Sequence, residues 1–221
     1  MILCLVTDRR RLGAALGLGS SDWVDALRAQ VFAAASAGVD LIQVRESDLD
    51  AAALTQLVRA ILTDTRDTSA KVLVNDRMDV AVASAAAGVH LRERSFSVDA
   101  ARSLGPSAFV VGRSVHQPAF EVLGGKADYL IAGTVLPTVS KTAVTCLGWG
   151  GLSAVVRAAD SPVLAIGGID VPSTPLVAAT GAAGVAAIGA FIPTRGQGLA
   201  EFVQKRVIEM RLGFDSEDSV S

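Results

Sequence analysis

Short apolar runs rich in β-branched residues recur along the chain, and longer segments with helical periodicity separate them. The separating segments place apolar residues three and four positions apart, as in Trp23, Leu27 and Val31, which is typical of a helix with one buried face. The apolar runs are too short for helices and have the composition of strands that are buried on both faces. The predicted strands are 2–6, 39–44, 71–74, 88–91, 108–111, 129–132, 163–166 and 184–188.

Eight strand-then-helix units in a chain of 221 residues predict a single (β/α)8 TIM barrel. Polar residues that can cap a helix, such as Ser97 and Asp170, precede several of the expected helices. An open doubly wound sheet is the alternative, but it ordinarily contains about five or six strands, and no G-x-G-x-x-G turn opens a helix here. We predict that the barrel spans residues 1–213 and that 214–221 form a short, acidic, disordered tail.

The charge balance narrows the choice of partners. The chain has 20 Lys and Arg against 22 Asp and Glu, a formal net charge of -2, and no basic run of the kind that grips nucleic acid. Cys4 and Cys146 are too few for a disulfide framework or a zinc site. No apolar stretch approaches about 18 residues, and the basic cluster near the start follows the apolar run, the reverse of a secretory signal. We therefore expect a soluble, cytoplasmic protein with neither nucleic acid nor membrane as a partner, and its apolar content leaves room for a homo-oligomer.

Glycines follow the last two predicted strands, where barrel enzymes commonly hold a phosphate. Gly167 and Gly168 come after the seventh strand, and Ile188 and Gly189 close the eighth. Because glycine leaves the neighbouring backbone N–H groups unshielded, these four residues are predicted to bind a phosphate. A tight turn would explain the same glycines without any ligand.

The loop after the sixth predicted strand carries a second candidate set of phosphate contacts. Thr138, Ser140 and Lys141 offer two hydroxyls and an ammonium within a few residues, and these groups suit phosphate oxygens. The segment 133–149 is long for a barrel loop, and we interpret it as a candidate lid.

Proton transfer and metal binding have one candidate each. His116, two residues beyond Ser114, follows the fifth predicted strand, and an imidazole with an ordinary pKa of about 6.5 exchanges protons near neutral pH. His90 lies inside the fourth predicted strand and is interpreted as structural. Asp76, next to Asn75, supplies a carboxylate of the type that Mg²⁺ takes together with phosphate oxygens.

A series of motifs in one order carries a resemblance to a known family. The chain contains VTD, IQVRE, VNDRMDVA, AAGVHL, GRSVH, ADYLIAG, PTVSK, AIGGI and GVAAIGA in that order between residues 6 and 190. This series resembles the thiamine phosphate synthase superfamily over nearly the whole chain. The resemblance implies a TIM barrel, a small phosphorylated thiazole substrate, and Gln43, Arg45 and Asn75 as substrate-binding residues.

Two branches of that superfamily compete. Thiamine phosphate synthase joins a hydroxymethylpyrimidine diphosphate to a thiazole phosphate, with Mg²⁺ on the leaving diphosphate, whereas the TenI-type branch isomerises the thiazole phosphate to its aromatic form. The synthase motif Q-x-R-E-K is matched by Gln43, Arg45 and Glu46, but Ser47 replaces the lysine, and Ser95 stands where the synthases have a further aspartate. Both departures fall on diphosphate chemistry, which depends on neutralising the charge of the leaving group.

We therefore predict a TenI-type thiazole tautomerase that needs no cofactor. The motifs R-E-S, R-S-F-S and G-R-S-V-H are similar to that branch. A tautomerisation requires only a proton moved between two positions of a bound ring. His116 is expected to move that proton and Ser114 to orient the imidazole, while Arg45 and Lys141 steer the other anionic end of the substrate.

An active synthase is the alternative to the tautomerase. In that case Asp76 would hold Mg²⁺, Glu93 would substitute for the missing carboxylate, and Arg92 or Arg94 would substitute for the missing ammonium. A third hypothesis is a barrel that binds a thiazole or thiamine phosphate as a regulator without turnover, which would show as thermal stabilisation by the ligand alone.

Overall fold

The computed structural model describes residues 1–117, 126–138 and 145–216, and its strands form a closed parallel barrel. Each strand pairs with the next along the chain, and β8 pairs with β1 to close the ring. The predicted TIM barrel is therefore confirmed. The strands are β1 (Ile2–Val6), β2 (Leu41–Val44), β3 (Lys71–Asn75), β4 (Gly88–Leu91), β5 (Val110–Val115), β6 (Tyr129–Gly133), β7 (Val163–Ile166) and β8 (Gly184–Ala187).

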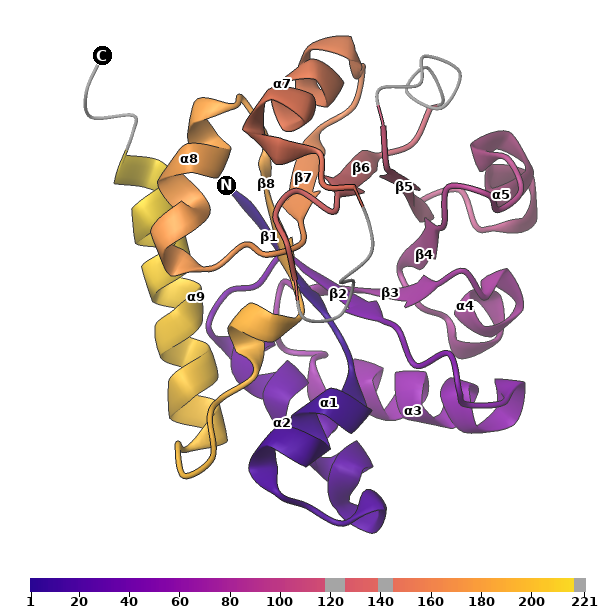
Figure 1. Ribbon diagram of the computed structural model, residues 1–221. Helices are drawn as coiled ribbons and strands as arrows, with labels where there is room; N and C mark the ends of the chain where they lie inside the picture. The colour runs from indigo at the N-terminus through magenta and orange to yellow at the C-terminus, as the bar shows by residue number, and fades with distance from the viewer. Residues whose placement is uncertain (118–125, 139–144, 217–221) are drawn as a thin grey trace.

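Helices form a ring around the strands and follow one another in chain order (Figure 1). Side chains of the preceding residues start several of them: the Ser97 hydroxyl accepts a hydrogen bond from the Ala100 N–H, as the sequence predicts. The described helices are α1 (Arg9–Leu16), α2 (Trp23–Ser36), α3 (Ala51–Asp64), α4 (Met78–Ser84), α5 (Val98–Leu104), α7 (Gly148–Ala158), α8 (Thr174–Ala179) and α9 (Leu199–Asp215), with short 3-10 turns η1 (Ser20–Asp22), η2 (Val171–Ser173) and η3 (Gly189–Phe191). In the described parts of the chain, no helix is long and apolar enough to cross a membrane.

The two faces of each strand serve two separate apolar layers. Inward-facing Cys4, Leu73 and Leu164 fill the inside of the barrel, and outward-facing residues such as Leu3 and Val89 pack under the helices. All five side chains are fully buried. Burying each large aliphatic side chain contributes about 1.5–3 kcal/mol to stability, so the double burial explains why the strands are recognisable as continuous apolar runs.

Two strands differ from their predicted bounds by two residues or more, and β3, β6 and β8 each differ by one residue. The predicted strand 108–111 is observed as β5 at Val110–Val115, because inward-facing Gly112 and Ser114 continue the pairing with β4 and β6 although neither residue is apolar. The second strand starts at Leu41 instead of residue 39, since the N–H of Val39 still bonds the Ala34 carbonyl and so completes the end of α2.

The predicted boundary between barrel and tail falls inside a helix. Helix α9 continues to Asp215, because Phe214 packs against the buried core and favours the extra turn. Residues 217–221 of the predicted tail lie outside the described residues.

Candidate active site

A cavity of about 1070 Å³ lies at the carboxyl ends of the strands, and each strand or the loop that follows it contributes to its lining. This position is where barrel enzymes carry their active sites. Every predicted site residue that the structure describes lines this one cavity. These residues are Gln43, Arg45, Asn75, Asp76, Ser114, His116, Thr138, Gly167, Gly168, Ile188 and Gly189. Ser140 and Lys141 lie outside the described residues, as does part of the candidate lid 133–149.

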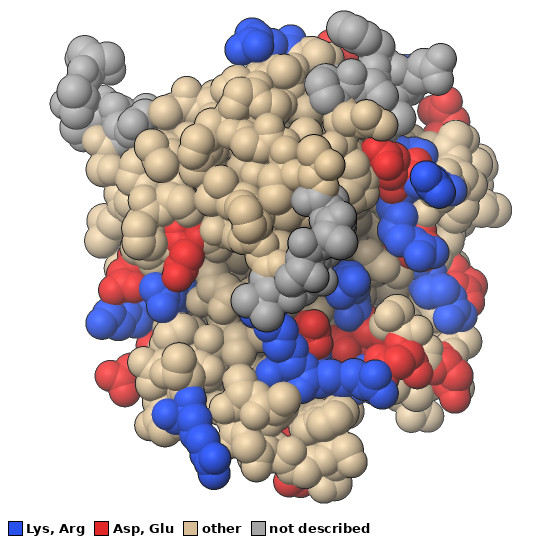
Figure 2. Space-filling view, viewed as in Figure 1, with Lys and Arg blue, Asp and Glu red and all other residues tan. Residues whose placement is uncertain are grey.

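The lining divides into two halves of different chemistry. The half that we call the polar half comes from β2–β5 and the loops after them, and it consists of Gln43, Arg45, Asn75, Asp76, His90, residues 92–96, Ser114 and His116. The half that we call the glycine half consists of Val6, Asp8, Arg11, Ile131, Gly133, residues 166–170 and residues 186–190, and Thr134, Pro137 and Thr138 from the loop after β6 complete the lining. Figure 2 shows Lys, Arg, Asp and Glu side chains gathered over the lower and right parts of this face, whereas the atoms over α7 and α8 are mostly uncharged.

In the polar half, side chains on neighbouring strands hold one another. Gln43 Nε2 donates to Asn75 Oδ1 over 2.9 Å, a bond that runs from β2 to β3. The backbone N–H of Arg45 donates to Thr7 Oγ1 over 2.9 Å, which fixes the start of the loop after β2. The amides of Gln43 and Asn75 are thus oriented before any ligand arrives, as a binding site requires.

Glu46, the acidic residue of the QVRE motif, is part of the scaffold and does not line the cavity. The buried carboxylate accepts hydrogen bonds from the Arg9 backbone N–H over 3.1 Å and from Arg9 Nη1 over 2.9 Å. Burial raises the pKa of Glu46, although the bonds from Thr7 and Arg9 act in the opposite direction. This pair ties the loop after β1 to the loop that carries Arg45.

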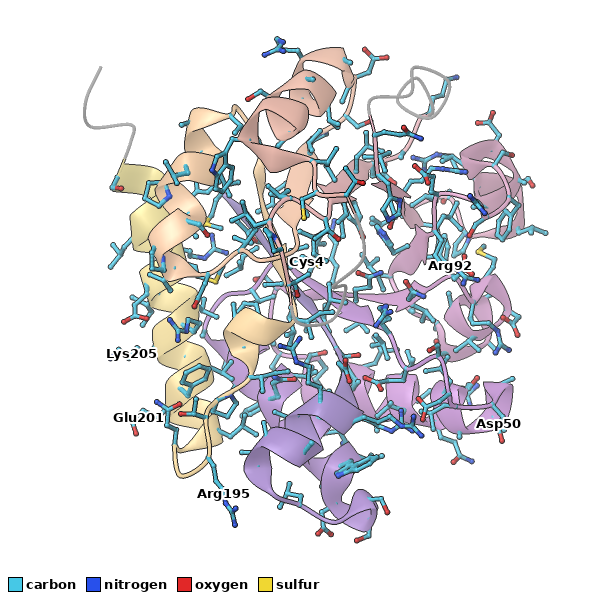
Figure 3. The ribbon with its side chains drawn as sticks, viewed as in Figure 1. Cys4, Asp50, Arg92, Arg195, Glu201 and Lys205 are labelled. Carbon is cyan, nitrogen blue, oxygen red and sulfur yellow. The ribbon has the colours of Figure 1, made fainter. Side chains whose placement is uncertain are left out.

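Asp76 begins the loop after β3 and meets the loop after β4. Its carboxylate accepts hydrogen bonds from the Ser95 hydroxyl and from Arg92 Nε, the latter over 2.6 Å, and it forms an ion pair with the Arg92 guanidinium. Burial acts to raise the pKa of Asp76, but the bonds from Ser95 and Arg92 hold it below its ordinary value. Arg92 lies on the loop between β4 and α5, at the right of the barrel mouth (Figure 3). Ser95 therefore donates a hydrogen bond to Asp76, whereas an aspartate at position 95 would place a second negative charge beside it.

The loop after β4 is fastened to β5 by an outward-facing arginine. Arg113 donates from Nη2 to the Glu93 carbonyl over 2.8 Å and from Nη1 to the Phe96 carbonyl over 3.0 Å. The Glu93 carboxylate accepts the backbone N–H of His116 over 3.0 Å, and its other oxygen lies 3.2 Å from His116 Nδ1. Glu93 is thus engaged with His116, whereas Arg92 and Ser95 of the same loop contact Asp76.

Ser114 is paired with a different histidine from the one that the sequence indicates. Its Oγ lies 2.8 Å from Nε2 of His90, and Nδ1 of His90 lies 3.0 Å from the Tyr129 hydroxyl. The expectation that Ser114 orients His116 is wrong, because His116 lies beyond the end of β5. His90 instead pairs with Gly112, the residue two positions before Ser114 on the same face of β5, and so reaches the serine. Complete burial lowers the pKa of His90 to about 3 against the opposing charge of Asp76, so the ring is neutral near pH 7.

The glycine half is shaped by backbone that other residues would not adopt. Gly167 and Gly168 have φ of 98° and 70°, in the left-handed region. A Cβ on Gly168 would lie 2.6 Å from Leu136 Cβ and 2.8 Å from the Pro137 carbonyl oxygen. These glycines are therefore required by the conformation, and they leave an exposed backbone surface on this side of the cavity.

Arg11 is a cavity residue that the sequence did not single out. Residues 9–11 are three consecutive arginines, and only the structure shows that their side chains have three different environments. Arg9 is buried, Arg10 pairs with Asp48 at the surface, and Arg11 lines the cavity with its Nη2 3.1 Å from where a Cβ on Gly189 would lie. A guanidinium beside exposed backbone N–H groups is a suitable arrangement for a phosphate.

The fold and this cavity define a (β/α)8 barrel protein with its candidate site at the carboxyl ends of the strands, a class that is mostly enzymatic. The thiamine monophosphate synthase family matches residues 16–191, and the chain belongs to this family.

Individual relatives agree with the family match. The chain is 40% identical over 162 residues to the thiamine-phosphate synthase of Methanoregula boonei, which covers 72% of this chain and 75% of the relative. It is 35% identical over 187 residues to the thiamine-phosphate synthase of Pyrococcus horikoshii, covering 84% and 90%. Among solved structures, thiamine phosphate pyrophosphorylase from Pyrococcus furiosus matches with a TM-score of 0.77 and 30% identity, covering 100% of this chain and 97% of the other.

These relatives contradict the tautomerase prediction. They are named as synthases and pyrophosphorylases, and the same names favour the alternative hypothesis. The prediction gave too much weight to Ser47 and Ser95. Ser95 is accommodated by its bond to Asp76, and Arg92 brings a cation to the same place.

Proposed function

We propose that the protein is a thiamine-phosphate synthase, a transferase that joins a hydroxymethylpyrimidine diphosphate to a thiazole phosphate. In this reaction a bond forms between the exocyclic methylene carbon of the pyrimidine and the thiazole nitrogen, and the bond from that carbon to the diphosphate oxygen breaks. Diphosphate leaves with the electron pair of the broken bond. The observation that carries the proposal is that one large cavity has cationic groups in both of its halves, because two anionic substrates must be bound together.

The glycine half is the proposed site of the thiazole phosphate. Backbone N–H groups around Gly167, Gly168 and Ile188-Gly189 are unshielded, and Arg11 stands beside Gly189. A phosphate there would gain neutral hydrogen bonds together with one charge-assisted contact. The apolar side chains Ile131 and Ile166 belong to the same half, where a thiazole ring would pack against them.

The polar half is the proposed site of the pyrimidine diphosphate. Arg45, Arg92 and Arg94 bring three guanidinium groups to this side of the cavity, and a leaving diphosphate is stabilised by such cations as its charge develops. Gln43 and Asn75 are fixed by their mutual bond and suit the hydrogen-bonding edge of a pyrimidine. Thr138, Ser140 and Lys141 remain proposed contributors to binding the same anionic groups.

Mg²⁺ is the proposed cofactor, and Asp76 is the residue that would hold it. Magnesium is usually bound by one or two carboxylates together with substrate phosphates, and Asp76 is held ionised on the cavity wall. Arg92 now pairs with that carboxylate, but its side chain is 72% exposed and free to turn toward a diphosphate. When bound, the metal would neutralise part of the diphosphate charge.

His116 takes a different proposed role from the one that the tautomerase hypothesis gave it. Joining the two substrates moves no proton between ring positions, so the reaction has no need of a shuttling imidazole. The contacts between Glu93 and His116 instead link the loop after β4 to the end of β5, and we propose that they keep Arg92 and Arg94 at the cavity rim.

The test is an assay of diphosphate release on the purified chain with both substrates and Mg²⁺. Release that requires both substrates, accompanied by thiamine phosphate, is the expected result. Reactions without the thiazole phosphate control for simple hydrolysis, and reactions with a chelator control for the metal. No release with both substrates, at protein concentrations where the barrel is folded, would contradict the proposed function.

A further inference from the structure

Three side chains inside the barrel form a hydrogen-bonded chain that ends at the cavity. The Tyr129 hydroxyl on β6 lies 3.0 Å from Nδ1 of His90 on β4, and Nε2 of His90 lies 2.8 Å from Oγ of Ser114 on β5. Tyr129 and His90 are 3% and 1% exposed. His90 and Ser114 line the cavity, whereas Tyr129 lies behind them.

Gly112 on β5 leaves the space that these three hydrogen-bonded side chains need. Gly112 pairs with both His90 and Tyr129 across the sheet. A Cβ on Gly112 would lie within 2.2–2.5 Å of three atoms at the outer end of the Tyr129 side chain, including the hydroxyl oxygen. Glycine at this position therefore allows the tyrosine ring to lie across β5 and reach the histidine.

The direction of the hydrogen bonds follows from the need to satisfy buried donors. Among the described residues, the hydrogen-bond partner of the Tyr129 hydroxyl is His90 and no other. A buried phenol hydrogen without an acceptor costs about 1–3 kcal/mol, so the hydroxyl donates to Nδ1. The neutral ring then carries its own hydrogen on Nε2 and donates it to Ser114 Oγ.

The reverse direction leaves an unpaired group. If Ser114 donated to Nε2, the ring hydrogen would be on Nδ1 and would donate to the Tyr129 oxygen. The tyrosine hydrogen would then have no acceptor among the described residues, in a position closed to water. The forward direction satisfies the donors of Tyr129 and His90 and leaves the serine hydrogen for the cavity.

We propose that Tyr129 and His90 are positioning residues that fix Ser114 as a hydrogen-bond donor toward the substrate. This proposal rests on the proposed function for the identity of the acceptor, which is an anionic oxygen of the diphosphate in the polar half. A donor that is already oriented stabilises charge that develops on that oxygen as the carbon–oxygen bond breaks, without reorganisation at the moment of reaction. His90 exchanges no proton in this role.

The first experiment determines which ring nitrogen of His90 carries the hydrogen, and it does not depend on enzymatic activity. The chain has two histidines, so labelling histidine ring nitrogens with ¹⁵N in an untagged protein gives two ring systems, and His116→Gln leaves only that of His90. The nitrogen that carries hydrogen is identified by its one-bond coupling to that hydrogen. Hydrogen on Nε2 is the expected result, and hydrogen on Nδ1 would overturn the proposal. Tyr129→Phe should shift the Nδ1 resonance, because that nitrogen loses its donor.

The second experiment is a double-mutant cycle on diphosphate release at saturating substrates. Ser114→Ala is expected to lower kcat about 100-fold, as loss of an oriented donor does elsewhere. Tyr129→Phe keeps the ring that packs against Gly112, and it should lower kcat about 3- to 10-fold with little change in KM. The double variant should be no slower than Ser114→Ala, because without the serine hydroxyl nothing remains to be oriented. Fully multiplicative losses would contradict the proposal.

Conservative replacements of His90 separate orientation from packing. His90→Gln can accept from Tyr129 through its carbonyl and donate to Ser114 through its amide, whereas His90→Leu can do neither. Higher kcat for the glutamine variant, at equal thermal stability, supports the positioning role, and equal rates for the two variants would contradict it. If the wild-type chain releases no diphosphate, the proposed function fails, while the tautomer measurement still decides the direction of the hydrogen bonds.

Discussion

The polar half and the glycine half of the cavity are lined by different parts of the chain. In the polar half, side chains on β2–β5 and their loops make the contacts, and they are held by bonds to one another, as between Gln43 and Asn75 or Asp76 and Arg92. In the glycine half, the backbone at Gly167 and Gly168 is the exposed surface. Substitutions in the polar half should therefore change binding and rate with the fold intact, whereas substitutions in the glycine half should also disturb the backbone.

The largest effect is expected when a side chain is added to a glycine of the glycine half. Gly168→Val places a branched carbon against Leu136 and the Pro137 carbonyl at a φ of 70°. We expect diphosphate release to fall at least about 100-fold and the free energy of unfolding to fall by about 1–3 kcal/mol. Kinetics and urea unfolding measure the two effects. Gly150→Ala is the matched control, because nothing lies within 4 Å of its added Cβ and alanine suits its place in helix α7, so it should lower neither quantity.

The next effect is expected from a cation of the polar half. Arg92→Gln removes the charge that pairs with Asp76 and faces the proposed diphosphate site. Steady-state kinetics should show kcat/KM for the pyrimidine diphosphate lowered between about 10- and 100-fold, with the thermal unfolding temperature nearly unchanged. Arg77→Gln is the control, since Arg77 also forms an ion pair with an aspartate but does not line the cavity. Equal losses in both variants would show that the position of Arg92 is irrelevant.

A smaller effect is expected from the cation of the glycine half. Arg11→Gln should raise KM for the thiazole phosphate about tenfold and leave kcat nearly unchanged, because it removes one charge-assisted contact to a bound phosphate. The thiazole alcohol, which lacks the phosphate, should be used equally poorly by wild type and variant. Arg10→Gln alters a neighbouring surface arginine and serves as the control. Unchanged KM in Arg11→Gln would exclude Arg11 from the phosphate site.

The last effect concerns the pH dependence of stability, and not substrate binding, in the polar half. The pKa of His90 is about 3 in the folded chain and about 6.5 when unfolded, so the unfolded state binds more protons between these values. The stability that the neutral ring contributes is complete above about pH 6.5 and is lost as pH falls, by at most about 1.4 kcal/mol per pH unit. Urea unfolding between pH 7 and 5 should show a steeper decline for wild type than for His90→Gln. An equal decline in both proteins would show that groups other than His90 cause the pH dependence of stability.

The barrel could be predicted from the sequence because its strands are buried on both faces. Runs such as Val163–Ile166 and Gly88–Leu91 stand out at their observed bounds. Strand β5 was placed less well, since its inward-facing residues Gly112 and Ser114 give no apolar signal, and Ser114 lines the cavity. Strands that are buried on both faces could therefore be predicted from their apolar residues. The part of β5 that lines the cavity could not, because a site residue there is polar.

The site residues could be predicted as a group but not in their pairings. Strand ends in a barrel meet at one rim, so the order of polar motifs was enough to gather Gln43, Asn75 and Gly168. Which histidine contacts Ser114, or which of three consecutive arginines lines the cavity, depends on strand register and helix phase. The wrong tautomerase prediction had the same origin, because Ser95 was judged alone, without its contact to Asp76 and the nearby Arg92.

If the two halves of the cavity bind two different substrates, one set of KM measurements separates them. KM for the pyrimidine diphosphate and KM for the thiazole phosphate are each measured for wild type, Arg92→Gln and Arg11→Gln, by diphosphate release. We expect Arg92→Gln to raise only KM for the pyrimidine diphosphate and Arg11→Gln to raise only KM for the thiazole phosphate, each about tenfold or more. If both variants raised the same constant, or each raised both equally, the division of the cavity into two substrate sites would be wrong.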